Sequence, residues 1–266
     1  MSQSEPIQHD PAADATALLQ FHRDPALLTV VNVWDVISAT VVSNVPGTKA
    51  LATASHSIAA SRGYRDGEHI PVAEMIGEIE RIVAATALPV TADLEAGYGD
   101  PDDTIRRAIG VGVSGANLED QLMPLPDAVA RVSAAMQAAV AEGVPDFVLN
   151  ARTDAFLLAG DRPRREVLAD AIERGRAYLE AGAPLVFVPG VLDESDIVAL
   201  VDAFGRKRLT VLGAPANPSL ARLDALGVAR VSYGPLSQRV ALTALAKLVE
   251  AVQAGGGVPA DTRAVN

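Results

Sequence analysis

Carboxylates follow two consecutive β-branched stretches of the chain, at the point where each predicted strand ends. Asp93 and Glu95 close the stretch that begins at Leu88, and Glu119 closes the next one. Because side chains two residues apart on a strand point to the same side, Asp93 and Glu95 should lie close together. Neighbouring carboxylates repel one another unless one is protonated or a cation lies between them.

A hard divalent cation is the natural partner of such a group. Oxygen ligands suit Mg²⁺ or Mn²⁺ better than Zn²⁺, since no histidine or cysteine lies in these segments. We therefore predict a metal site of Asp93, Glu95 and Glu119, with Mg²⁺ as its ion and Mn²⁺ as the other option. The alternative, that each acid caps a helix or faces water, stays open.

Arg152 follows the next predicted strand, in the segment Asn150–Asp154. Its planar guanidinium suits a carboxylate or a phosphate, which makes it a candidate substrate ligand. A salt bridge with Asp154 or Glu119 would explain the same residue, and the two roles are compatible.

An earlier predicted strand runs into a hydroxyl-rich turn, Thr53–Ser57, whose backbone amides could bind a carboxylate. Asp66 lies on the loop that follows, where it could reach a metal-bound water or simply form a turn. His56 is the best placed of the four histidines, although a loop histidine can equally be solvated. No Ser-His-Asp arrangement surrounds Ser55, which disfavours serine nucleophile chemistry.

Composition excludes several functional classes. A formal charge of -11 and a pI of about 4.8 disfavour nucleic acid as a partner. The chain has no cysteine, which excludes disulfides and thiolate ligands and is compatible with the reducing cytoplasm, where we expect the protein to be. Every apolar stretch is interrupted by a charged residue or glycine, so we expect a soluble protein without a membrane span.

Short β-branched stretches alternate with longer Ala-, Leu- and Arg-rich stretches from Leu28 to Leu248, a pattern typical of βαβ units. The predicted strands are Leu28–Val33, Thr48–Thr53, Leu88–Asp93, Gly115–Glu119, Asp146–Ala151, Pro184–Val188, Leu209–Leu212 and Val228–Ser232. The predicted helices are Val36–Val45, Val72–Thr86, Pro101–Val111, Pro126–Glu142, Arg164–Ala181, Glu194–Phe204, Ser219–Leu226 and Pro235–Ala254.

Eight such units favour a parallel (β/α)8 TIM barrel of the α/β class, with an open flavodoxin-like sheet as the main rival. We expect a disordered lead-in over residues 1–14, a single barrel domain over 15–256 and a tail over 257–266. An additional N-terminal helix, Ala12–His22, should cover the barrel floor.

The motifs, in this order, resemble those of the isocitrate lyase and phosphoenolpyruvate mutase superfamily. The resemblance runs from Asn32 to Ser232. The motifs that carry it are Asn32–Asp35, Ala50–Ser61, Gly63–Gly67, Asp93–Gly99, Asn117–Asp120, Asn150–Asp154 and Val186–Gly190.

The resemblance implies a Mg²⁺-dependent site for a 2-oxo acid or its enolate, which works on carbon–carbon or carbon–phosphorus bonds next to a carboxylate. Of these, a carbon–carbon lyase is the expected enzyme. Asp93 would be the direct metal ligand, and Asp66, Glu95 and Glu119 would hold metal-bound waters. Arg152 would bind the substrate carboxylate. The substrate would also contact Trp34, Thr53, Ser55 and His56, and Arg152, Glu119 and Asp66 would be the catalytic residues.

Departures from the family pattern reduce the number of reactions that the resemblance can imply. The lyase loop with its catalytic cysteine is replaced by the short segment Leu122–Asp127, and the mutase loop is also missing. Pro189 stands where mutases have a histidine, and Ala54 stands where they have a serine.

Three functions stay open at this point. The first is a lyase or decarboxylase for a small 2-oxo or 2-hydroxy acid, the second is mutase-type P–C chemistry, and the third is a metal-dependent 2-oxo acid binding protein. The superfamily often exchanges its last helix between subunits, so the resemblance also implies a homodimer or homotetramer with Pro235–Ala254 swapped.

Overall fold

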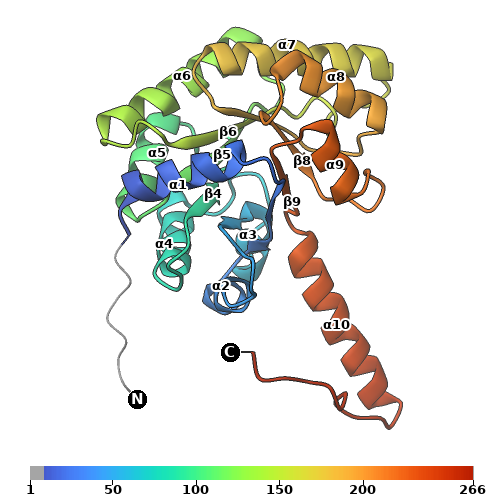
Figure 1. Ribbon diagram of the computed structural model, residues 1–266. Coiled ribbons are helices and arrows are strands. Elements are labelled where there is room, and N and C mark those ends of the chain that lie inside the picture. Colours follow the sequence, from blue (N-terminus) through green and yellow to red (C-terminus); the bar gives the residue numbers. More distant parts are fainter. Residues whose placement is uncertain (1–8, 266) are drawn as a thin grey trace.

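A parallel β-barrel forms the centre of the computed structural model, which describes residues 9–265 (Figure 1). Its strands are β1 (Leu28–Val30), β2 (Asn32–Val33), β3 (Leu51–Thr53), β4 (Val90–Asp93), β5 (Gly115–Glu119), β6 (Val148–Arg152), β7 (Leu185–Val188), β8 (Leu209–Leu212) and β9 (Arg230–Ser232). They follow the order β1-β9-β8-β7-β6-β5-β4-β3-β2.

One residue, Val31, separates β1 from β2, so the two are halves of the first barrel strand. The first half pairs with β9 and the second half pairs with β3, both in parallel. This arrangement closes the ring and confirms the predicted (β/α)8 barrel over the open sheet. The strands β3, β4, β6 and β9 begin two or three residues later than predicted.

The barrel is surrounded by helices that largely match the predicted ones. They are α1 (Pro11–Arg23), α2 (Val36–Ser43), α3 (Ser55–Ser61), α4 (Val72–Val83), α5 (Pro101–Gly110), α6 (Leu125–Ala141), α7 (Arg164–Glu180), α8 (Glu194–Phe204), α9 (Leu220–Leu226) and α10 (Leu236–Gln253). Helix α3 corrects the turn predicted at Thr53–Ser57, since Ile58 and Ala59 are fully buried there in the apolar layer. In the described chain, no helix is long and apolar enough to cross a membrane.

The N-terminal helix covers one end of the barrel, as predicted. Leu18 and Leu19 of α1 pack in one cluster with Leu28 and Val30 of β1 and Val148 of β6. The disordered lead-in predicted over residues 1–14 is wrong at its end, because Asp10 caps α1 and accepts hydrogen bonds from the amides of residues 12 and 13. Residues 1–8 lie outside the described part of the chain.

Helix α10 leaves the barrel and points away from it (Figure 1). Leu242, Leu245, Val249 and Val252 form an exposed apolar stripe at helical spacing. A groove of about 1000 Å³ runs between α2 and α10. Beyond α10, residues 257–265 contain neither helix nor strand.

A buried carboxylate anchors the connection between β5 and α6, which is only five residues long (120–124). Asp120 accepts hydrogen bonds from Tyr178 Oη at 2.6 Å, Arg174 Nη1 at 3.2 Å and the backbone amides of Leu122 and Asp154, both at 3.0 Å. Removing one partner of a buried ion pair leaves the other charge without compensation.

We therefore expect Asp120→Asn to lower the free energy of unfolding by about 3 kcal/mol, measured by urea denaturation. Asp103→Asn is the matched control, because Asp103 pairs with Arg107 on the exposed face of α5. A loss for Asp120→Asn as small as that of the control would contradict the anchoring role.

Candidate active site

Asp93 ends β4 and is held by the end of the neighbouring strand β3. Its Oδ2 accepts hydrogen bonds from Ser55 N at 3.1 Å and Ser55 Oγ at 2.8 Å. Its backbone amide donates to Thr53 Oγ1 at 2.9 Å. Within residues 9–265, its Oδ1 is buried and has no hydrogen-bond partner, so Asp93 keeps one oxygen available to a ligand.

These bonds correct the roles predicted for Thr53 and Ser55. Thr53 is fully buried and its hydroxyl accepts from the Asp93 backbone, while the amide and the hydroxyl of Ser55 both donate to the Asp93 carboxylate. Both residues are buried and position Asp93.

Glu95 is buried two residues beyond Asp93, in a backbone conformation with φ of 51°. Its carboxylate accepts hydrogen bonds from Tyr98 Oη at 3.1 Å and from the backbone amide of Glu68. Burial raises the pKa of Glu95 to about 7, and the charges of Asp93 and Asp66 act in the same direction. Glu68 and Tyr98 also have positive φ angles, so the two loops that meet at Glu95 are strained at three non-glycine residues.

Glu119 and Arg152 end the adjacent strands β5 and β6 and form an ion pair. Arg152 Nη1 lies 2.7 Å from Glu119 Oε2, and Arg152 Nε donates to Asp154 Oδ1 at 2.7 Å. Burial raises the pKa of Glu119 to about 7 against the opposing effect of Arg152. Both the salt bridge and the rim position predicted for Arg152 are therefore present.

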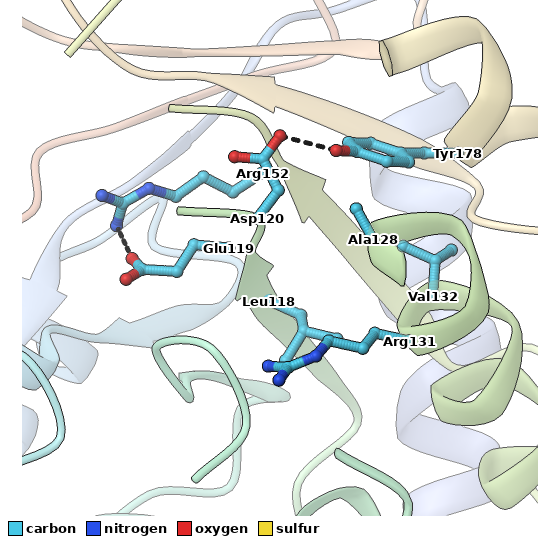
Figure 2. Close-up of a pocket in the computed structure, with 8 residues that line it drawn as sticks. All are labelled: Leu118, Glu119, Asp120, Ala128, Arg131, Val132, Arg152 and Tyr178. Carbon is cyan, nitrogen blue, oxygen red and sulfur yellow. Dashed lines mark hydrogen bonds and ion pairs between the residues drawn. The ribbon is translucent and has the colours of Figure 1, made fainter. Parts of the chain in front are cut away.

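Figure 2 shows this ion pair on one side of the strands and the Asp120–Tyr178 hydrogen bond on the other. The residues drawn line a cavity of about 10 Å³. That volume is on the order of one water molecule, which is too small for a carboxylic acid. The cavity therefore belongs to the support of the site.

The other predicted site residues are Asp66, His56 and Trp34. Asp66 is exposed on the loop between α3 and α4, close enough for its charge to raise the pKa of Glu95. His56 is half-buried at the start of α3, and its Nδ1 has no partner in the described chain. Trp34 is half-buried after β2 and lines the groove between α2 and α10.

The three carboxylates predicted to hold a metal do not form a cluster of direct ligands. Among the described residues, no group of three or more Asp, Glu, His or Cys side chains is close enough to hold an ion. Glu95 and Glu119 are each hydrogen-bonded or ion-paired to protein groups, whereas Asp93 Oδ1 has no such partner among residues 9–265. The arrangement is compatible with one direct ligand, Asp93, and with carboxylates that act through water.

Sequence reasoning missed the supporting residues Glu68 and Tyr98. It did consider the salt bridge between Arg152 and Asp154, which the structure contains. Glu68 and Tyr98 meet Glu95 only because two loops fold over one another, and no spacing in the sequence indicates that contact.

The chain is similar to several known proteins. The 2,3-dimethylmalate lyase of Eubacterium barkeri is 29% identical over 238 residues, which cover 82% of this chain and 79% of that protein. The oxaloacetate decarboxylase of Paraburkholderia xenovorans is 28% identical over 245 residues, covering 86% of this chain and 78% of that protein. A solved protein of Burkholderia cenocepacia J2315, provisionally called a phosphonomutase, is 41% identical with a TM-score of 0.84, over 91% of this chain and 99% of that one.

The family model for phosphoenolpyruvate phosphomutase matches residues 18–253, which is most of the chain. This match agrees with the resemblance carried by the motifs at the strand ends. The chain belongs to the phosphoenolpyruvate phosphomutase family, within the phosphoenolpyruvate mutase and isocitrate lyase superfamily.

Proposed function

We propose that the chain is a Mg²⁺-dependent lyase for a small 2-oxo or 2-hydroxy carboxylic acid, which it cleaves at a carbon–carbon bond or decarboxylates through an enolate. The observation that carries this proposal is the unpartnered, buried Oδ1 of Asp93 within electrostatic reach of Glu119 and Arg152. Relatives named for dimethylmalate cleavage and oxaloacetate decarboxylation support the substrate class.

The donor set fits a hard divalent cation. Asp93 would hold it directly, and Glu95, Glu119 and Asp66 would hold its water ligands. Burial has raised the pKa values of Glu95 and Glu119, and a nearby positive charge would lower them again. When bound, Mg²⁺ supplies Lewis acidity that stabilises the negative charge of an enolate-like state.

The protein's own residues would bind and orient the substrate. Arg152 offers a planar fork for a substrate carboxylate and is held in place by Glu119 and Asp154. Glu119 lies at the strand end beside Arg152, where its carboxylate would accept a proton from the substrate or return one. Trp34 and His56 stay substrate contacts under this proposal.

P–C bond chemistry is the second candidate, favoured by the similarity to the Burkholderia protein. The five-residue connection 120–124 and Pro189 oppose it, because the mutase elements expected at both places are missing. Assaying phosphonopyruvate by phosphorus-31 NMR distinguishes the two reactions, since only the mutase converts a phosphonate signal into a phosphate ester signal.

The metal proposal predicts that Asp93→Asn abolishes Mg²⁺-dependent turnover, because the variant loses the charge of the proposed direct ligand. The measurement is product release from a panel of 2-oxo and 2-hydroxy acids, including oxaloacetate and 2,3-dimethylmalate, with Mg²⁺ or with EDTA. Asp202→Asn on the exposed face of α8 removes the same charge away from the site and should keep full activity. Turnover of Asp93→Asn at the wild-type rate would exclude the proposed mechanism.

The raised pKa values predict how the stability of the metal-free protein depends on pH. The pKa values of Glu95 and Glu119 are about 7 in the folded protein, whereas the ordinary value is 4.5. Between pH 4.5 and pH 7 the two carboxyl groups therefore bind protons more tightly in the folded state than in the unfolded state. Raising the pH through that window therefore lowers the free energy of unfolding.

We expect the melting temperature in EDTA to fall from about pH 5 to about pH 8, and Mg²⁺ to restore it mainly at the higher pH. Differential scanning calorimetry measures both effects. The double variant Glu95→Gln, Glu119→Gln is the control and should lose this part of the pH dependence. A melting temperature that rises with pH in EDTA would contradict the prediction.

We also propose that the protein assembles as a homodimer or homotetramer through α10. The exposed stripe of Leu242, Leu245, Val249 and Val252 supports this proposal, because an unpartnered apolar helix face favours association. Leu245→Glu should reduce the mass measured by light scattering to that of the monomer. Lys247→Glu, which adds negative charge on another face of α10, should leave the mass unchanged, and an unaltered mass for Leu245→Glu would count against this interface.

A further inference from the structure

Arg230 is a fully buried arginine inside the barrel. It is the first residue of β9 and has 0% of its surface exposed. Its strand neighbour Val231 belongs to the apolar layer between strands and helices, so the Arg230 side chain points to the opposite side, into the barrel. In the described chain, no group accepts a hydrogen bond from any of its three guanidinium nitrogens.

Other polar side chains inside the barrel are also buried without a hydrogen-bond partner in the described chain. Thr91, Asn150 and Thr210 each have a buried side-chain oxygen without a partner in residues 9–265, and Thr210 is the strand partner of Arg230 on β8. The neighbours Ala92, Ala151 and Val211 belong to the outer apolar layer, so these three side chains also point inward. The barrel therefore has a polar interior between the apolar floor and the rim.

His22 of α1 is the titratable group below Arg230. Its Nδ1 lies 2.7 Å from the carbonyl oxygen of Leu18, which can only accept, so Nδ1 carries the proton and donates. Burial lowers the pKa of His22 to about 3, and the charge of Arg230 adds to this effect. His22 is thus neutral and adds no second positive charge beside the arginine.

Asp93 lies two residues beyond the inward-facing Thr91 on β4, so its carboxylate faces the same barrel interior as the buried guanidinium. It raises the pKa of Arg230, which burial lowers to about 10, so the arginine stays protonated at neutral pH. A buried charge without an opposite charge is costly, and the attraction between two charges is stronger in the barrel than in water. Asp93 and Arg230 therefore compensate one another across the barrel interior.

We infer that Arg230 is a positioning residue that acts as the internal counter-cation of Asp93 and sets the affinity of the metal site. In the metal-free protein it neutralises part of the charge of Asp93. A divalent cation on Asp93 meets the positive charge of Arg230, which weakens metal binding until an anionic substrate adds its own negative charge. This inference rests on the metal site proposed above.

The test is Mn²⁺ binding to the whole protein without substrate, followed by electron paramagnetic resonance. Arg230→Met removes the charge but retains much of the side-chain volume, and replacing a buried charge by an apolar group is often neutral or stabilising. We expect its Kd for Mn²⁺ to fall about tenfold, equivalent to about 1.4 kcal/mol, with a melting temperature no lower than that of the wild type. Adding a 2-oxo acid should tighten Mn²⁺ binding more in the wild type than in Arg230→Met.

Two variants serve as controls. Arg230→Lys keeps the positive charge and should bind Mn²⁺ with nearly the wild-type Kd. Arg165→Met removes the same charge from an 88% exposed side chain on α7 and should also leave the Kd unchanged. An equal fall in Kd for Arg165→Met would show that net charge, and not Arg230, sets the affinity, which overturns the inference.

The remaining outcomes separate this inference from the proposed function. If the wild type binds no Mn²⁺, the metal site itself is wrong and the inference falls with it. If the wild type binds Mn²⁺ and Arg230→Met binds it equally or more weakly, only the inference is overturned. Should Arg230→Met fail to fold, the Nε–Hε NMR signal of Arg230 in the wild type decides: Mg²⁺ must shift it, and an unmoved signal overturns the inference.

Discussion

Negative charge buried at the carboxyl ends of β4, β5 and β6 is the constraint on which the rest of the site depends. The charge of Asp93 raises the pKa of both Glu95 and Glu119, Glu95 is buried, and Asp93 and Glu119 are half-buried. Such charges persist only when donors or cations compensate them. The neighbouring elements supply this compensation, each in a different way.

For Asp93 the compensation comes from the start of α3, whose first residue donates both its amide and its hydroxyl. For Glu95 it comes from a loop whose backbone is held in a left-handed conformation at Glu68, which places an amide against the carboxylate. For Glu119 it comes from Arg152, which is itself fixed by Asp154. The loops after these strands are thus constrained by charge as much as by packing.

Much of the barrel could be predicted from the sequence because its signals are local. Alternation of β-branched and Ala-rich stretches indicates βαβ units, and the ends of β5 and β8 and both ends of α8 fall at the predicted residues. The placement of Asp93, Glu119 and Arg152 at strand ends follows from the same alternation. Strand starts were less accurate, because the residues predicted to open β3 and β4 lie outside the ladder.

The direction of individual side chains could not be predicted in the same way. Thr53 and Ser55 were expected to face a substrate, whereas the structure turns both toward Asp93, because a buried carboxylate takes the nearest donors. Arg230 carries no local signal at all, since an arginine at a strand start ordinarily reaches solvent. Its position depends on which face of β9 points inward, and that follows only from closure of the barrel.

The polar interior also explains why different parts of the barrel contribute to stability and to function. Apolar burial is concentrated in the layer between strands and helices and at the floor under α1. Above that floor, the barrel interior contains threonine, asparagine and arginine side chains in place of apolar ones. Since the outer layer contributes most of the hydrophobic stabilisation, the interior is free to carry charges that a packed core would exclude. That freedom allows a positive group to lie beneath the rim carboxylates without any contact with solvent.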